Sequence, residues 1–269
     1  MGSKPCGVLS AAGSVWVSLY GNSEVVRIDP VSHRVLSKAD TGAAPCGMAY
    51  GGGSVWVEDY SGNALTRVDA STGKAVRDYP VGGAPYDVAF ADGAAWSTDY
   101  NDGTLTRVDA ATGRTTKVRV GGTPTGIAPS GSALWVATGT TDLVRVDPRS
   151  ARVLGRVPLG LTATWTAYDD THVWVSDTSA GRVAVVDSGT GRVVGTADTG
   201  GRPADGDAVD GVAWFPDRAA SSVVGVDATG KVVGRHPVGL NDPFVLDSVG
   251  STLWVGDFAG TTVRVLPLS

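Results

Sequence analysis

The chain has 269 residues, a formal net charge of −5, 42% hydrophobic residues and 18% charged residues. Its 38 glycines and 14 prolines are spread along the whole length, which is typical of many short strands joined by tight turns. No segment concentrates Lys and Arg, and no apolar run is long enough to cross a bilayer. The composition therefore argues against a nucleic-acid partner and against a membrane span.

Tryptophan marks an internal repeat of about forty residues. The repeated tryptophans are Trp16, Trp56, Trp96, Trp135, Trp174, Trp214 and Trp254, and only Trp165 lies off this grid. Eleven residues before each of them, the repeats begin at Pro5, Pro45, Pro85, Pro124, Ala163, Pro203 and Pro243. A bulky ring at the same place in every unit predicts a role in the core. The same reasoning makes the repeated Arg27, Arg67, Arg107 and Arg145 structural.

The predicted elements follow the same order in each repeat, and the second copy serves as the example. Residues 46–50 read as a short strand, 51–53 as a glycine turn, 54–58 as a second strand and 64–69 as a third. Asp69 can bond its own backbone and Gly73 suits a positive φ, so residues 69–74 predict a turn. This turn leads into a fourth strand over residues 75–80.

Four short antiparallel strands cannot bury both of their faces alone, so the seven repeats must stack on one another. We expect an all-β, seven-bladed β-propeller that forms a single domain over residues 1–269, with blades beginning near 5, 45, 85, 124, 163, 203 and 243. An open solenoid would need distinct capping ends, and nothing marks a break into two domains. Only one strand, near residues 262–266, follows Trp254, which predicts a three-stranded last blade whose open edge invites dimerisation.

The two cysteines, Cys6 and Cys46, occupy the same position in neighbouring repeats. Equivalent positions on adjacent blades come close together near the axis, so a disulfide is one alternative. It requires Cα atoms within about 7 Å of each other. We expect instead two small buried thiols, the more common state of such residues. Neither the number nor the spacing of the cysteines suggests a metal site.

Three short motifs recur along the whole chain. They are Pro-x-Gly-[VIM]-Ala, Ser-x-Trp-Val-x-Asp and Arg-[VI]-Asp-x-x-[TS]-Gly-[KR]. Together they resemble the propeller superfamily that includes streptogramin (virginiamycin B) lyases and the YVTN-repeat surface proteins. The resemblance implies the propeller fold, and the surface proteins suggest a secreted or cell-envelope location. The first four residues lack the apolar core of a signal peptide, so we expect a signal segment that is absent from this sequence.

The resemblance also implies an activity. Streptogramin lyases are magnesium-dependent enzymes that open a cyclic depsipeptide ester by elimination, using histidines beside the central opening. This chain has three histidines, His33, His172 and His236, which fall in a turn between strands, at the start of a second strand and in an outermost strand. None corresponds to an axial position, which puts the lyase mechanism in doubt and favours ordinary surface roles.

The upper face of the propeller gathers the starts of the innermost strands and the loops after the second strands. Binding residues are expected where copies depart from the repeat on this face. Glu58 is the only acid at its repeat position, and aromatic side chains follow several second strands. The candidate ligand-binding residues are Tyr86, Asp87, Trp165, Asp205, Phe244, Glu58, Tyr60 and Tyr100.

Two adjacent blades carry an acid where the other copies have leucine or alanine. Asp207 and Asp247 lie four residues after the repeat proline, and Asp205 is close to them in sequence. Oxygen ligands of this kind could hold Ca²⁺ or Mg²⁺, or form a carboxylate pair with a raised pKa. The interpretation we favour is a water-filled channel lined by hydrogen-bonded aspartates.

Two hypotheses of different class follow from the sequence. The preferred one is a secreted or cell-envelope propeller that binds a small molecule or peptide at its central upper opening. The alternative is a lyase or hydrolase of the streptogramin lyase type, with a metal or carboxylate site in place of the family's histidines. No nucleophile elbow, P-loop, dinucleotide-binding motif or zinc spacing is present in the sequence.

Overall fold

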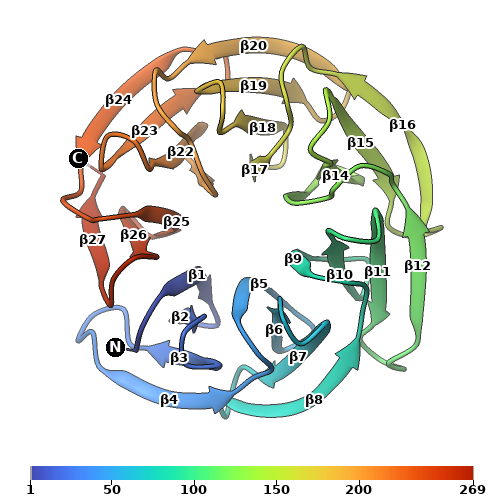
Figure 1. Ribbon diagram of the computed structural model, residues 1–269, viewed down its shortest axis with the longest axis vertical. Helices are drawn as coiled ribbons and strands as arrows, with labels where there is room; N and C mark the ends of the chain where they lie inside the picture. The colour runs from blue at the N-terminus through green and yellow to red at the C-terminus, as the bar shows by residue number, and fades with distance from the viewer. Residues whose placement is uncertain (1, 269) are drawn as a thin grey trace.

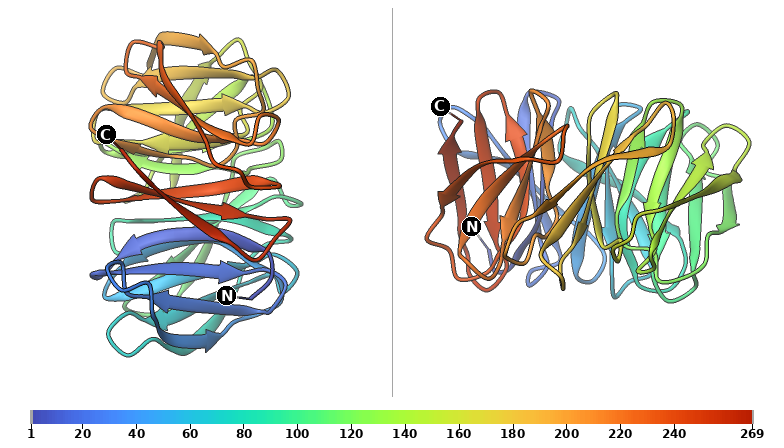
Figure 2. Two further views of the ribbon diagram at one scale, coloured as in Figure 1. Left: turned by 90° about the vertical axis from the view of Figure 1, so that its left-hand side faces the viewer. Right: turned by 90° about the horizontal axis from the view of Figure 1, so that it is seen from above.

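The structure is a computed structural model that describes residues 2–268. These residues form 27 strands in seven antiparallel sheets, which stand around a central axis as the blades of a propeller (Figure 1). Seen from the side, the molecule is a flat disc (Figure 2). The predicted seven-bladed, all-β fold is confirmed. Within the described residues, no helix has the length and apolar character needed to cross a membrane.

Each blade runs from an innermost strand outward, in chain order. The innermost strands are β1 (Pro5–Ala11), β5 (Pro45–Gly51), β9 (Pro85–Ala91), β13 (Ile127–Ser130), β17 (Trp165–Tyr168), β21 (Asp207–Val209) and β25 (Pro243–Val249). The second strands are β2 (Ser14–Leu19), β6 (Ser54–Asp59), β10 (Ala94–Asp99), β14 (Ala133–Ala137), β18 (His172–Asp177), β22 (Val212–Asp217) and β26 (Thr252–Asp257).

The outer half of each blade completes the sheet. The third strands are β3 (Glu24–Ile28), β7 (Ala64–Asp69), β11 (Thr104–Asp109), β15 (Asp142–Asp147), β19 (Arg182–Asp187), β23 (Ser222–Asp227) and β27 (Val263–Pro267). The fourth strands are β4 (Val35–Asp40), β8 (Lys74–Pro80), β12 (Thr115–Arg119), β16 (Arg152–Pro158), β20 (Arg192–Asp198) and β24 (Val232–Pro237). Among the described residues, the last blade has three strands, as predicted.

The repeated tryptophans form the core between blades. None of the seven exposes more than 8% of its surface. On the third strand, the guanidinium of Arg67 lies 5.2 Å from the ring centroid of Trp56 and donates to the carbonyl of Ala110 in the next blade at 2.9 Å. Arg27 makes the equivalent contacts in the first blade, so both arginines tie neighbouring blades together, which is a structural role.

The aspartate that ends most second strands fixes the chain that enters the same blade. Asp99 accepts a hydrogen bond from the backbone N–H of Gly82 at 3.0 Å, and Asp217 accepts one from that of Arg202 at 2.9 Å. Both carboxylates are buried. Their repetition is therefore structural, because each supplies an acceptor to a connecting loop that would otherwise bury an unpaired donor.

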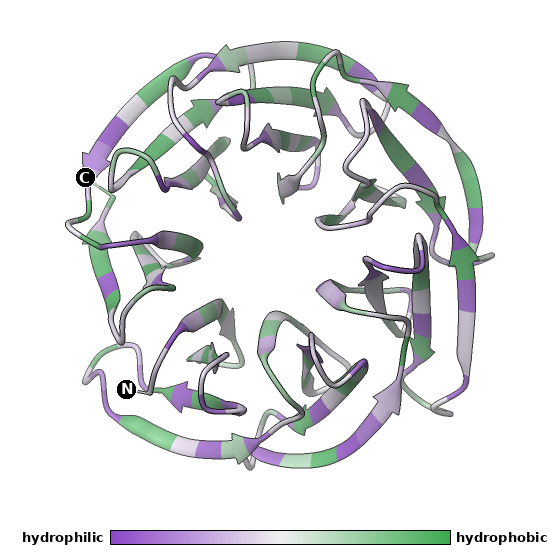
Figure 3. Ribbon diagram, viewed as in Figure 1, coloured by the Kyte–Doolittle hydropathy of each residue, from purple (hydrophilic) through white to green (hydrophobic). Residues whose placement is uncertain are grey.

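The outermost strands are largely exposed. In Figure 3, both hydrophobic and hydrophilic residues occur along β4, β8 and β24 at the rim of the disc. At most one residue of each of these three strands is buried. The interior of the disc is held by the inner three strands, whose residues supply most of the buried core.

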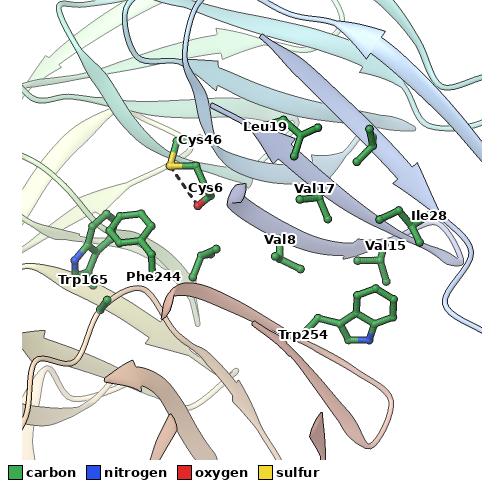
Figure 4. Packing of buried hydrophobic residues seen from close by; sticks show 13 residues of the cluster. Cys6, Val8, Val15, Val17, Leu19, Ile28, Cys46, Trp165, Phe244 and Trp254 are labelled. Atoms are coloured by element: carbon green, nitrogen blue, oxygen red, sulfur yellow. Dashed lines mark hydrogen bonds between the residues drawn. A yellow bond between two sulfur atoms is a disulfide. The ribbon is translucent and has the colours of Figure 1, made fainter. Parts of the chain in front are cut away.

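The expectation of free thiols was wrong, because Cys6 and Cys46 form a disulfide. Their Cα atoms lie 4.7 Å apart, well inside the range that a disulfide requires. This closeness arises because β1 and β5 converge toward the axis at their starts. The bond links the first two blades beside the upper opening (Figure 4).

Candidate functional site

In the first and fourth blades, the innermost strand comes so close to its neighbour that a side chain would clash with the adjacent backbone. A Cβ placed on Gly7 would lie 2.1 Å from the carbonyl oxygen of Cys46, and one on Gly126 would lie 2.8 Å from the backbone nitrogen of Thr166. In the sixth blade, Asp205 replaces this glycine, and its N–H donates to the carbonyl of Phe244 at 3.2 Å. The departures from the repeat therefore lie at the axis itself.

Three aromatic rings from alternate blades meet across the axis. The ring centroid of Trp165 lies 5.2 Å from that of Tyr86 and 5.4 Å from that of Phe244. Figure 4 shows Trp165 and Phe244 side by side near the disulfide. Because the third, fifth and seventh blades are not neighbours, these contacts fill the central space at this level. We call Tyr86, Trp165 and Phe244 the aromatic plug.

Above the plug, the upper face holds a cavity of about 250 Å³, here called the upper cup. Its walls are mostly aromatic, and ring contacts link them to the plug, as between Phe244 and Phe258 at 5.4 Å and between Tyr60 and Tyr86 at 5.7 Å. Tyr20 in turn packs edge-on against Phe258. The residues that line the cup are Cys6, Tyr20, Cys46, Glu58, Tyr60, Tyr86, Arg218, Phe244 and Phe258.

Glu58 is the acid of the cup. It is fully buried, and its Oε1 accepts a hydrogen bond from the N–H of Gly47 at 3.0 Å. Its Oε2 has no hydrogen-bond partner among the described residues. Burial raises the pKa of Glu58 well above its usual range, and the hydrogen bond from Gly47 opposes this only in part. Burial of the Tyr86 side chain raises its own pKa to about 12, and the charge of nearby Glu58 contributes.

Two cations lie at the edge of the cup. Arg218 stacks 5.1 Å from the ring centroid of Phe244, and Asp242 accepts hydrogen bonds from its Nε at 2.6 Å and its Nη2 at 2.7 Å. The ammonium of Lys4 lies 5.8 Å from the centroids of both Tyr20 and Phe258. The faces of these rings thus attract positive charge, as the quadrupole of an aromatic ring does.

Below the plug, an axial channel of about 330 Å³ runs between the innermost strands. It is lined by acids that bridge adjacent blades. Asp247 Oδ2 accepts from the N–H of Ser10 at 2.6 Å, and Asp207 Oδ2 accepts from the N–H and hydroxyl of Ser248 at 3.0 and 2.6 Å. Asp87 bonds across to the fourth blade in the same way, accepting from Ile127 at 3.0 Å.

The crowding of these acids favours their protonated forms. Burial raises the pKa of Asp87 to about 7. Burial holds the pKa of Asp205 well above its usual range, followed by the charges of Asp87 and Asp207. Burial and the charge of Asp207 do the same for the pKa of Asp247. Desolvation within the channel and the four acids also raise the pKa of Tyr168, which lines the same channel and is partly exposed.

The channel aspartates are hydrogen-bonded, as in the interpretation favoured from the sequence. No group of three or more His, Cys, Asp or Glu side chains within residues 2–268 is arranged to hold a metal ion. The oxygens of Asp207 and Asp247 already accept bonds from the backbone of the next blade. A Ca²⁺ or Mg²⁺ ion on these two residues stays a prediction.

The structure divides the residues expected at a single upper mouth into separate groups. Glu58, Tyr60, Tyr86 and Phe244 line the upper cup. Trp165 completes the plug, and Tyr100 packs behind Tyr86 at 5.6 Å. The four aspartates, Asp87, Asp205, Asp207 and Asp247, lie in the channel below. A role in ligand binding stays a prediction for all of them.

Sequence reasoning missed Tyr168 as a channel residue. It lies five residues after the start of its repeat, where the second and third copies have Tyr50 and Phe90, which also line the channel. That recurrence of aromatic side chains was the available signal. His33, His172 and His236 line neither the cup nor the channel and instead pack against the repeated tryptophans.

Comparison with solved structures places the fold among known propellers. No family model matches the sequence, and no curated protein matches it. A streptogramin B lyase superposes with a TM-score of 0.86 at 16% identity, covering 99% of this chain and 94% of that one. A catalytically inactive virginiamycin B lyase from Staphylococcus aureus with quinupristin gives 0.85 at 17% identity, covering 99% and 96%.

The likeness extends to propellers of other kinds. The structure named U3-55K superposes with a TM-score of 0.85 at 12% identity, covering 99% of this chain and 96% of that one. The predicted resemblance to the streptogramin lyase propellers is therefore confirmed at the level of the fold. At such identities the fold is what these structures share with the chain.

Proposed function

We propose that this protein is a binding propeller that holds a small molecule or part of a peptide in the upper cup. The observation that carries this proposal is the aromatic cavity built from the loops of several blades, floored by the plug and containing the buried acid Glu58. Concave, largely apolar sites with a few polar groups are the usual form of a ligand pocket. Rigid aromatic rings provide contact area at a low cost in conformational entropy.

The size of the cup limits what enters it. At about 250 Å³ it lies below the range of roughly 300–1,000 Å³ that accommodates whole drug-sized ligands. A larger ligand would therefore insert one ring or one side chain and lie with its remainder on the loops around the mouth. A peptide with a single anchoring side chain fits this description, as does a small amine or phenol.

A variant that removes one wall tests this function. Tyr86→Thr takes away a ring of the cup and of the plug, while the fourth and fifth repeats already have Thr125 and Thr164 at this position, so we expect the fold to survive. Fragments of one ring should perturb the NMR signals of the cup in the native protein and lose at least tenfold in affinity in the variant. The matched control is Tyr50→Ala on the lower channel, which should leave binding unchanged.

We also propose an oxidising location, secreted or in the cell envelope. The Cys6–Cys46 disulfide supports this, because disulfides persist in such compartments and are reduced in most cytosols. Fractionation of the source cells, with alkylation of free thiols before lysis, tests the proposal. Recovery of the protein in the cytosol with both thiols alkylated would refute it.

Lyase or hydrolase activity is the second candidate. It is favoured by the shared fold of the virginiamycin B lyase and by the buried carboxyl of Glu58, whose pKa is raised by burial, as in many general acids. Incubation with quinupristin and mass spectrometry of the product test it directly. A linear product that Glu58→Gln abolishes would support the enzyme, whereas an unchanged ring would leave the binding function.

A further inference from the structure

The position of the Glu58 carboxyl destabilises the fold. The carboxyl is fully buried, and Oε2 has no partner among the described residues, although a buried polar atom without a hydrogen bond destabilises a fold. The side chain nevertheless belongs to the wall of the upper cup. An unpaired acceptor beside a cavity is a binding position for a donor that enters from solvent.

The neighbouring blades show that the fold does not need an acid here. Ser18 occupies the same position in the first blade, and its hydroxyl donates to the carbonyl of Cys46 in the next blade at 2.6 Å. Thr98 does the same in the third blade, donating to Thr125 at 3.0 Å. A small hydroxyl thus provides the connection between blades, and Glu58 gives up that connection in the second blade.

The rings of the cup favour a cation as the donor. Lys4 and Arg218 already lie over the faces of Tyr20, Phe258 and Phe244 at 5.1 to 5.8 Å. Arg218 is neutralised by its two hydrogen bonds to Asp242. The carboxyl of Glu58 has no such partner for its Oε2, so it is the acid of the cup that can still pair with an incoming cation.

We infer that the ligand of the upper cup carries a protonated amine or guanidinium group, bound between the aromatic ring faces and the carboxylate of Glu58. This inference rests on the proposed binding function and specifies its ligand class. The cation would donate an N–H to Oε2, satisfying the unpaired oxygen, while the rings contact its substituents. An organic amine or a basic side chain of a peptide fits both the size and the charge of the cavity.

Three probes of one shape and different charge test the inference by calorimetry at pH 7. They are benzylamine, benzyl alcohol and benzoate. Benzylamine should bind at least tenfold more tightly than benzyl alcohol, and benzoate should bind most weakly. Equal or tighter binding of benzyl alcohol would overturn the cation preference while the cup remains a binding site. Tightest binding of benzoate would overturn it in favour of a carboxylate ligand on Arg218.

Variants separate the role of Glu58 from that of the cup. Glu58→Gln keeps the shape and removes the charge, and should cost benzylamine at least tenfold in affinity without changing the affinity for benzyl alcohol. Glu58→Thr copies the third blade and is the control for folding, with a melting temperature at least equal to that of the native protein and the same loss of benzylamine. Unchanged benzylamine affinity in both variants would refute the role of Glu58. If none of the probes binds the native protein, both the inference and the proposed function fail.

Discussion

One alanine has a left-handed backbone conformation that glycine adopts in two equivalent turns. Ala151 has φ +55° in the turn between the third and fourth strands, where Gly73 and Gly191 have φ +69°. The left-handed region costs a residue with a Cβ about 1–2 kcal/mol. We predict that Ala151→Gly raises the free energy of unfolding by about 1 kcal/mol, measured by urea denaturation.

The reverse change at an equivalent turn is the matched control. A Cβ on Gly191 would meet Trp135 and Val157 at 3.6 and 3.7 Å, which are ordinary contact distances, so only the φ opposes it. Gly191→Ala should therefore lower the stability by a similar amount. A destabilised Ala151→Gly variant would mean that packing of the alanine methyl outweighs the backbone strain.

Several buried acids make the free energy of unfolding decrease as the pH rises. Burial raises the pKa of Asp59 and of Asp87 to about 7, from about 3.8 in the unfolded chain. Between these values the folded protein binds more protons than the unfolded one, so stability falls as the pH rises through this window. We predict a higher urea midpoint at pH 5 than at pH 8.

Exposed acids in turns have lowered pKa values, so they make the stability rise with pH, but only at pH values below this window. Hydrogen bonds lower the pKa of Asp69 to about 2, so its stabilisation is present above about pH 4 and is lost only as the pH falls further. Glu58→Gln removes one buried acid and should narrow the difference between pH 5 and pH 8. A higher midpoint at pH 8 for the native protein would contradict the assignment of raised pKa values.

Neighbouring residues of one strand also mark the limit of what the sequence predicts. Tyr86 and Asp87 both depart from the repeat, and both were expected at one mouth. Consecutive side chains of a strand point in different directions, so Tyr86 faces the cup and Asp87 faces the channel. The repeat identified the unusual positions, but the contact between Tyr86 and Trp165, two blades away, depends on distances across the axis that no local pattern encodes.

Among the elements, the first two blades are distinguished by a covalent link between β1 and β5. The grid of tryptophans and prolines predicted all seven blades, because each copy repeats one packing solution. It did not predict that the sulfur atoms of Cys6 and Cys46 are bonded, because the separation of two innermost strands follows from the closure of the ring. Equivalent positions in the repeat were necessary for the disulfide but not sufficient.

We predict that replacing both cysteines by serine lowers the free energy of unfolding by about 4 kcal/mol, the value expected for a loop of about forty residues in the unfolded chain. Denaturation of the native protein with and without reductant provides the comparison. The reduced native protein and the double variant should have similar midpoints. A native protein that is insensitive to reductant would show that the disulfide contributes little to stability.

At the scale of the whole molecule, the seventh blade differs from the others because, within the described residues, its third strand forms the outer sheet edge. β27 has no fourth strand beside it, whereas β4, β8 and their counterparts cover the third strands of the other six blades. An unpaired strand presents free backbone donors and acceptors to another chain. We predict a concentration-dependent dimer through β27, detected by sedimentation velocity.

The site of pairing can be checked by replacing one residue of the edge. Val265→Pro removes a backbone donor from β27 and should shift the equilibrium toward the monomer, while Val233→Lys on β24, the outermost strand of the sixth blade, is the control. A native protein that sediments as a monomer at all concentrations would exclude edge pairing.

The aromatic plug also determines whether the central axis of the ring is open from one face to the other. In a propeller with an empty axis, a solute that entered at one face could leave at the other. Here the rings of Tyr86, Trp165 and Phe244 separate the acidic axial channel from the aromatic upper cup. The two cavities share no lining residue, so we expect a substitution in the wall of one to leave solute binding in the other unchanged.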